Sequence, residues 1–116
     1  MSTVPHEQRR HVRYPVEYPG SFSAKDVHTN GIILNLSIAG CRALSDVPLS
    51  ASEVGVRIEV PRRQNPLEIL LATVRWTRGT EFGVEFLRME PDQERRLREL
   101  IQENEADLAL RIWQRG

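Results

Sequence analysis

Apolar and polar residues alternate along most of the chain before Pro91, which is the pattern of half-buried strands. In residues 16–24 the apolar side chains stand at even positions, and Pro19 among them favours an edge position or a bulge. Residues 25–30 are rich in turn formers and end at Asn30-Gly31, a pair typical of tight hairpins. We therefore expect a first strand over 16–24 and a hairpin turn at Asn30-Gly31.

Residues 31–38 show the same alternation. An extended strand here would turn four apolar side chains to one side, namely Ile32, Leu34, Leu36 and Ile38. Asn35 and Ser37 would then share the opposite, exposed face. Gly40 follows, where a residue that tolerates positive φ lets the chain turn sharply and brings backbone N–H groups to the surface. Two short polar side chains before a glycine turn suit the floor of a ligand site.

Four further strands are expected over residues 41–44, 54–60, 67–77 and 82–86, with a turn at Arg78-Gly79 between the last two. In residues 67–77, one face is expected to carry Leu70, Ala72, Val74 and Trp76. In the last strand the inward face is expected to carry Phe82, Val84 and Phe86. The pattern predicts a mainly β fold, a small six-stranded antiparallel barrel that closes its edges and leaves one outer face for a ligand.

The pattern changes at Pro91, which suits the first turn of a helix, as do Asp92 and Glu94 near the positive end of its dipole. Apolar residues then recur at helical spacing: Leu97, Leu100, Ile101, Leu108, Ile112 and Trp113. We expect a C-terminal α-helix over residues 90–116, packed across one end of the barrel. At about 1.5 Å per residue it is longer than a barrel end requires. Its distal half has three alternative uses: a homodimer contact, docking on a partner, or folding back on the barrel.

The totals bound the remaining possibilities. The 116 residues suit one domain, with a flexible lead over 1–8, the barrel and its arginine segment over 9–89, and the helix over 90–116. Sixteen basic and sixteen acidic residues balance, so global charge does not indicate binding to a nucleic-acid polymer. Cys41 is the single cysteine, and there is no signal-peptide core or membrane-spanning run. A cytoplasmic location without membrane insertion is therefore expected.

Arg9 and Arg13 form the basic cluster that precedes the first strand. A spacing of four places both side chains on one face of either an extended segment or a helical turn. Pro15 biases Tyr14 towards an extended conformation, so the cluster lies in a linker or at a strand edge. Taken alone, the cluster is interpreted as a solvated basic turn; with the Asn35–Gly40 stretch downstream, it becomes a candidate clasp over the ligand floor.

Together these residues resemble the motifs of the PilZ domain, a bacterial family of cyclic di-GMP receptors. R-x-x-x-R is present as Arg9 and Arg13, and [D/N]-x-S-x-x-G is present as Asn35, Ser37 and Gly40. The stretches 74–76 and 82–86 resemble the late strands of the family, so the resemblance covers roughly residues 8–100. It implies that these five residues bind cyclic di-GMP. No other cofactor is expected, and no metal, because a single cysteine and unpaired histidines offer no metal-ligand spacing.

The chemistry of the five residues agrees with this implication. Arginine has a rigid donor fork that can bind two phosphate oxygens, or O6 and N7 of guanine, together. Asn35 offers an acceptor and two donors, Ser37 a small hydroxyl, and Gly40 close access to the backbone. Without the arginines, the better interpretation of Asn35 and Ser37 is a polar outer face with a local bond to the backbone. Further contacts are expected at Gln8, Arg10 and Trp76.

Two positions differ from common forms of the family. The resemblance implies that the residue at Gln8 influences whether one ligand or a stacked pair is bound. Asn35 stands where aspartate is frequent, which removes one negative charge beside the arginines.

The expected function is that of a stand-alone receptor whose arginine segment is ordered over the barrel by the ligand. It would signal to an effector protein in motility, biofilm or polysaccharide secretion, by analogy with the family. One alternative is an adaptor of the same fold that does not bind nucleotide. The other is a small barrel that binds RNA or DNA, which the neutral charge disfavours. No enzyme is expected, because the sequence has no catalytic triad, no metal-type histidine spacing and no glycine-rich phosphate loop.

Overall fold

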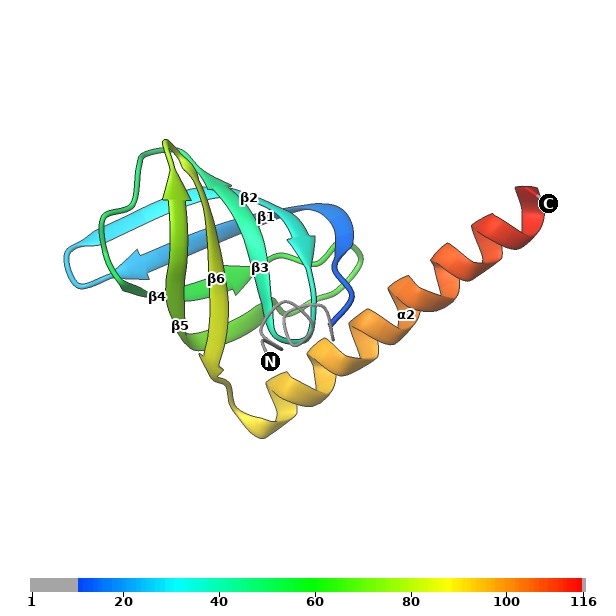
Figure 1. Ribbon diagram of the computed structural model, residues 1–116. Coiled ribbons are helices and arrows are strands. Elements are labelled where there is room, and N and C mark those ends of the chain that lie inside the picture. The colour runs from blue at the N-terminus through cyan, green and yellow to red at the C-terminus, as the bar shows by residue number, and fades with distance from the viewer. Residues whose placement is uncertain (1–10, 116) are drawn as a thin grey trace, which may run out of the picture.

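The computed structural model describes residues 11–115, and along the terminal helix it describes side chains only at positions 91–107, 109 and 110. Within the described residues, six strands and one helix follow one another (Figure 1). Their bounds are β1 Tyr14–Ala24, β2 Val27–Leu36, β3 Gly40–Ser45, β4 Glu53–Ile58, β5 Leu67–Arg78, β6 Glu81–Arg88 and α2 Pro91–Arg115. Gln8, Arg9 and Arg10, which the sequence predicts as ligand contacts, lie outside the described residues.

The strands form a closed antiparallel barrel in the order β1-β2-β3-β6-β5-β4, with β4 returning to pair with β1. This confirms the predicted six-stranded barrel with a C-terminal helix. The core fills the barrel with inward side chains from every strand, and Phe22 meets Phe82 edge to face with ring centroids 4.9 Å apart. Phe82 and Val84 are buried and Phe86 packs against the core, as the alternation in the last strand predicts.

The first hairpin turn is not at Asn30-Gly31. The turn lies at Lys25-Asp26, and Asn30 and Gly31 pair with Ser21 and Gly20 in the middle of β1 and β2. Gly31 has a different role there, because a Cβ at this position would lie 2.0 Å from the carbonyl oxygen of Leu44 on β3. The glycine permits a close approach of two strands rather than a tight turn.

The predicted alternation in β2 is interrupted by a bulge. Ile33 pairs with Ala43 and Asn35 with Arg42, so Leu34 is an extra residue on its strand. The extra residue changes the parity of the inward positions, and Ile33 and Leu36 are fully buried. Ile32 and Ile38, which were expected on the inward face, are exposed. The prediction was therefore correct for Leu36 and wrong for both isoleucines.

A second irregularity changes the faces of β5. The register shifts between Val54 and Val56 on β4, where the partner changes from Ala72 to Ile69. Ile69 and Ala72 are consequently buried, whereas Leu70 is 47% exposed and Trp76 is 41% exposed. A further register shift, against β6, lies between Val74 and Trp76. The expected common face of Leu70, Ala72 and Trp76 is therefore wrong, since a single period of two does not run through these shifts.

The helix α2 packs on the barrel with its first turns and then extends away from it (Figure 1). Leu97 and Leu100 belong to the buried core and Ile101 packs against it, while Leu110 is exposed. Arg96 donates to the carbonyl oxygen of Pro66 at 3.1 Å, which ties the helix to the loop between β4 and β5. No helix among the described residues is both long and apolar enough to cross a membrane.

Candidate ligand-binding site

Arg13 lies beside Asn35, although 22 positions separate them in sequence. Nη1 of Arg13 donates a hydrogen bond of 3.2 Å to Oδ1 of Asn35. The pairing of Pro15 with Asn35, across β1 and β2, brings the end of the arginine segment to this position. Arg13 is exposed and Asn35 half-buried, so the guanidinium is held at the surface of the barrel. The second arginine of the motif, Arg9, lies outside the described residues.

The side-chain oxygen of Asn35 has a second partner. The backbone N–H of Arg42 donates to Oδ1 at 3.0 Å, across the bulge where β2 pairs with β3. This bond fixes the amide so that its oxygen faces Arg13 as well. Asn35 is thus a positioning residue for the arginine, and an aspartate carboxylate in the same place would present equivalent acceptor oxygens.

Ser37 is buried, in contrast to the exposed face expected for it. Its side chain is only 1% exposed, and Oγ accepts hydrogen bonds from the N–H groups of Ala39 at 3.0 Å and Gly40 at 3.1 Å. The hydroxyl also lies 3.3 Å from the carbonyl oxygen of Gly40, to which it donates. The local bonding of serine to its own turn therefore determines its geometry, because β2 has already ended at Leu36.

Gly40 is needed for space rather than for positive φ. Gly79 is the positive-φ glycine of the described chain, and Gly40 adopts ordinary backbone angles. A Cβ on Gly40 would lie 2.1 Å from the carbonyl oxygen of Val84, a backbone atom of β6. The glycine lets β3 and β6 begin their pairing directly beside the Ser37 turn, which holds the turn against the barrel.

Trp76 extends the site across the outer face of the barrel. Gly83 lies between the buried Phe82 and Val84, so its open side faces outwards, and its strand neighbours are Arg42 and Trp76. A Cβ on Gly83 would lie 2.3 Å from Nε1 of Trp76, which shows that the indole covers this glycine. The sequence predicted Trp76 on an apolar strand face. In the structure the indole lies over Gly83, which has no side chain, and remains exposed to solvent.

We call the row Asn35, Arg42, Gly83 and Trp76 the polar strip, since its members are cross-strand neighbours on β2, β3, β6 and β5. Sequence reasoning missed Arg42. A signal was present, because Arg42 stands between Cys41 and Ala43, both fully buried, and a strand must turn it outwards.

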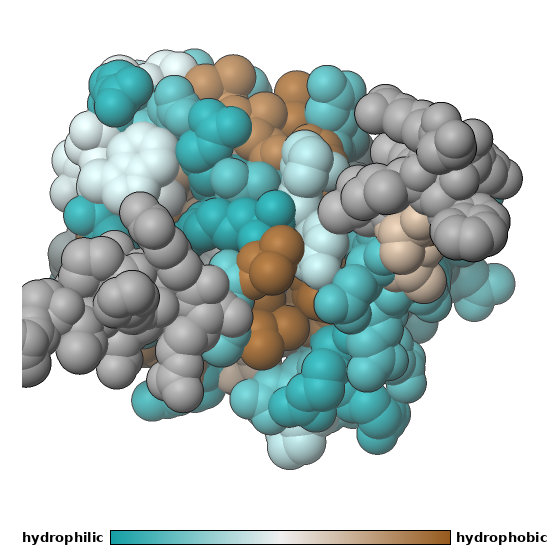
Figure 2. Space-filling model, turned by 45° about the vertical axis from the view of Figure 1, so that its right-hand side comes forward, coloured by the Kyte–Doolittle hydropathy of each residue, from teal (hydrophilic) through white to brown (hydrophobic). Residues whose placement is uncertain are grey.

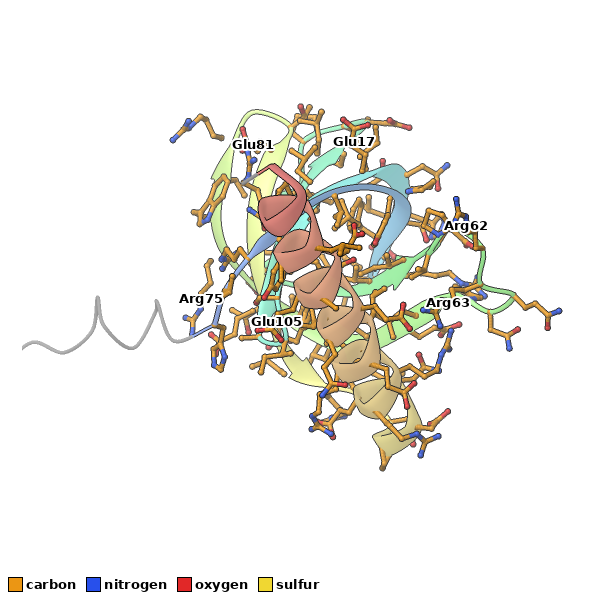
Figure 3. The ribbon with its side chains drawn as sticks, turned by 90° about the vertical axis from the view of Figure 1, so that its right-hand side faces the viewer. Glu17, Arg62, Arg63, Arg75, Glu81 and Glu105 are labelled. Carbon is orange, nitrogen blue, oxygen red and sulfur yellow. The ribbon has the colours of Figure 1, made fainter. Side chains whose placement is uncertain are left out.

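One ion pair includes Arg42 of the strip, and a second involves Arg75, the residue before Trp76. Arg42 pairs with Glu81, and Nε of Arg75 donates to Oε1 of Glu85 at 2.8 Å. Glu81 and Arg75 appear on the same side of the barrel in Figure 3, away from Arg62 and Arg63 in the loop between β4 and β5.

Cys41 lies behind the strip and has no accessible thiol. Burial raises the pKa of its thiol to about 12, and the positive charge of Arg13 acts in the opposite direction. A protonated, buried thiol is a poor nucleophile. Cys41 therefore belongs to the core, and the charge of Arg13 is close enough to affect it.

Tyr14 connects the arginine segment to α2. It directly follows Arg13, is buried, and pairs with Leu36. Desolvation raises the pKa of the Tyr14 phenol, and the charge of Glu105 on α2 and a hydrogen bond to it act in the same direction. Glu105 is labelled in Figure 3. One residue after Arg13, the chain therefore contacts the helix.

The molecular surface carries both hydrophilic and apolar side chains. Figure 2 shows mainly hydrophilic side chains on this view of the molecule, interrupted by small apolar areas. The exposed apolar side chains include Ile38, between Ser37 and Gly40, and Leu87 on β6. They line, with Arg88 and Arg98, a groove of about 140 Å³ between β6, α2 and the Ser37 turn.

Comparison with known families gives one match. The sequence pattern of the family described as "PilZ domain" matches residues 7–103, which is most of the chain. No curated protein sequence matches.

Several solved structures share the fold. The inhibitor of motility MotI/DgrA of Bacillus subtilis has a TM-score of 0.69 and 15% identity, covering 85% of this chain and 52% of that one. The PilZ domain of YcgR from Escherichia coli, solved with c-di-GMP, has a TM-score of 0.63 and 17% identity, covering 90% and 97%. The PilZ domain of CeSA from a cellulose-synthesizing bacterium has a TM-score of 0.65 and 18% identity, covering 81% and 98%. This chain thus spans about half the length of MotI/DgrA.

Proposed function

The chain belongs to the PilZ domain family, and on this premise we propose that it is a cyclic di-GMP receptor that acts by binding rather than by catalysis. The ligand would be bound at Arg9, Arg13, Asn35, Ser37 and Gly40. The observation that carries the proposal is the hydrogen bond from Arg13 to Asn35, which brings the two halves of the motif together. The PilZ domain of YcgR, solved with c-di-GMP, has the same fold.

The geometry suggests different roles for the motif residues. Arg9 and Arg13 would bind phosphate oxygens or a guanine edge through their donor forks. Asn35 would orient Arg13 through Oδ1. Ser37 would shape the turn through its bonds to Ala39 and Gly40, and the turn would itself contact the ligand.

Three residues are proposed as secondary contacts. Trp76 offers an exposed indole over Gly83, and an aromatic face of this kind can stack on a base. Arg10 and Gln8 precede Arg13 in the arginine segment, and Gln8 would influence whether one ligand or a stacked pair is bound. The measured stoichiometry would therefore show whether one ligand or a stacked pair is bound with glutamine at position 8.

The signal would arise from ordering of the arginine segment by the anionic ligand, since closely spaced arginines repel one another until phosphates join them. Tyr14 ends this segment and contacts Glu105 on α2, so ordering of the segment would also change the contact with α2. The output would pass to an effector protein or to a second copy of the chain through α2. MotI/DgrA, which shares the fold, is an inhibitor of motility, and a motility effector is one candidate.

A second candidate function is that of an adaptor that does not bind nucleotide. It is favoured by the fact that Arg13 and Ser37 already have partners within the protein. In that case the motif would serve only to stabilise the turn and the start of β1.

Isothermal titration with cyclic di-GMP separates the two candidates. We expect saturable binding by the wild type, its loss in Arg13→Ala, and no heat with GTP at the same concentrations. Melting temperatures of both proteins check that the variant is folded, and the ligand should raise only that of the wild type. No binding by either protein would favour the adaptor, whereas equal saturable binding by both would show that cyclic di-GMP is bound without Arg13 and would contradict the proposed site.

A further inference from the structure

The polar strip contains an arginine that the motif does not include. Arg42 lies between Asn35 on one side and Gly83 on the other, and Trp76 is the next residue across. Its flanking residues Cys41 and Ala43 are fully buried, so its side chain stands on the outer face. Arg42 and Asn35 are partners on adjacent strands, and such strands lie about 4.8 Å apart.

The backbone and the side chain of Arg42 have different partners. Its N–H holds Oδ1 of Asn35 at 3.0 Å, and the same oxygen accepts from Arg13. Its guanidinium pairs through Nη1 with Glu81 on β6. Arg42 is therefore connected to the proposed site by its backbone, while its side chain is engaged by an acidic residue beside the strip.

The ion pair is suited to exchange. The side chains of Arg42 and Glu81 are 41% and 25% exposed, and ion pairs at such half-open positions stabilise a protein little. A guanidinium carries five N–H donors in a planar fork, so a phosphate can bind it in place of a carboxylate. An anionic ligand lying along the strip between Arg13 and Trp76 would pass over Arg42.

On the basis of the proposed function, we propose that Arg42 is a further ligand-binding arginine and that Glu81 is its counter-ion when the site is empty. A phosphate of the cyclic dinucleotide replaces the Glu81 carboxylate on the Arg42 guanidinium. Glu81 thereby sets the affinity, because its negative charge competes with the ligand for one cation.

The test measures dissociation constants for cyclic di-GMP by isothermal titration at one fixed ionic strength. The variants are Arg42→Ala, Arg42→Lys, Glu81→Gln and the double variant with Arg42→Ala and Glu81→Gln. The matched control is Glu68→Gln, since Glu68 forms a comparable exposed pair with Arg57 at 3.3 Å on β4 and β5, the other side of the barrel. Arg13→Ala serves as the reference for loss of the motif.

We expect Arg42→Ala to weaken binding roughly tenfold, Arg42→Lys to weaken it less, and Glu81→Gln to strengthen it roughly threefold. The gain from Glu81→Gln should disappear when Arg42 is alanine, because the two effects act through one contact. Glu68→Gln should bind like the wild type. Glu81→Gln leaves Arg42 in place, so the test does not depend on the stability of the alanine variant.

Three results would overturn the inference in distinguishable ways. If Arg13→Ala abolishes binding while Arg42→Ala and Glu81→Gln bind like the wild type, the receptor function holds and the role of Arg42 is wrong. If the wild type itself does not bind, the proposed function fails and this inference fails with it. A gain from Glu81→Gln that persists without Arg42 would also contradict it, since it would reflect general charge.

Discussion

At the residue scale, Asn35 and Ser37 have different roles although they are two positions apart in one motif. Asn35 faces outwards and holds Arg13, whereas Ser37 is buried and bonds to its own turn. The sequence predicted which residues belong to the motif, and Arg13 and Asn35 do meet. It could not predict the burial of Ser37, because a period of two assumes that the strand continues beyond Leu36.

Replacing Ser37 by alanine should destabilise the fold. The substitution leaves the N–H groups of Ala39 and Gly40 without the Oγ acceptor in a partly buried turn. We expect a loss of about 1–3 kcal/mol in the free energy of unfolding, measured by urea denaturation. Ser50→Ala, at an exposed position, is the control and should change it little. An equal effect of both substitutions would contradict the role given to the turn.

Cys41 should make stability fall at alkaline pH. Its thiol has a pKa of about 12 when folded, against an ordinary value of 9.0, so the unfolded chain loses its proton first. The stabilisation is complete below pH 9 and is lost as the pH rises towards 12. Between these values the slope attributable to Cys41 should approach about 1.4 kcal/mol per pH unit.

The measurement is urea unfolding of wild type and Cys41→Ala at several pH values from neutral to alkaline. Tyr14, whose phenol pKa is also raised, contributes a similar alkaline loss to both proteins. The difference in slope between the two therefore isolates the thiol. Parallel curves would show that Cys41 does not titrate as described.

At the scale of elements, the existence of six strands and a helix followed from hydrophobic periodicity, and the faces of two strands did not. Leu34 in β2 is an extra residue opposite β3, and β5 shifts its register against β4. Each bulge reverses the inward and outward positions beyond it. Local patterns do not show where such a bulge lies, because a bulge is defined by the pairing with the neighbouring strand. The hairpin turn predicted at Asn30-Gly31 was wrong for a similar reason, since Gly31 allows β3 to pack closely against β2 instead of forming a turn.

The two halves of α2 should contribute unequally to stability. Leu97 is 3% exposed and packs in the core, whereas Leu110 is 53% exposed on the part of the helix that extends away. Leu97→Ala should cost about 2–5 kcal/mol, because it leaves a cavity between the helix and the barrel. Leu110→Ala should stay within about 0.5 kcal/mol. Urea unfolding of both variants would measure these changes in the free energy of unfolding. A comparable loss for Leu110→Ala would show that the distal half of α2 packs on the protein.

At the scale of the whole molecule, Tyr14 links the proposed ligand surface to the helix. The polar strip crosses β2, β3, β6 and β5, and Tyr14 reaches α2 directly after Arg13. The motif allowed the family to be predicted from sequence, and the family pattern over residues 7–103 confirms it. Arg42 could not be assigned to the strip from spacing alone, because its neighbours Gly83 and Trp76 come from strands distant in sequence.

The central claim, that cyclic di-GMP is bound at the Ser37 turn and along the polar strip, is tested most directly by nuclear magnetic resonance on ¹⁵N-labelled protein. Adding the ligand should shift the backbone amide signals of Ala39, Gly40 and Arg42 and the indole N–H signal of Trp76. The amide signals of Arg57 and Glu68, on the other side of the barrel, should remain in place. Unchanged signals at saturating ligand, or shifts centred on Arg57 and Glu68, would contradict the claim.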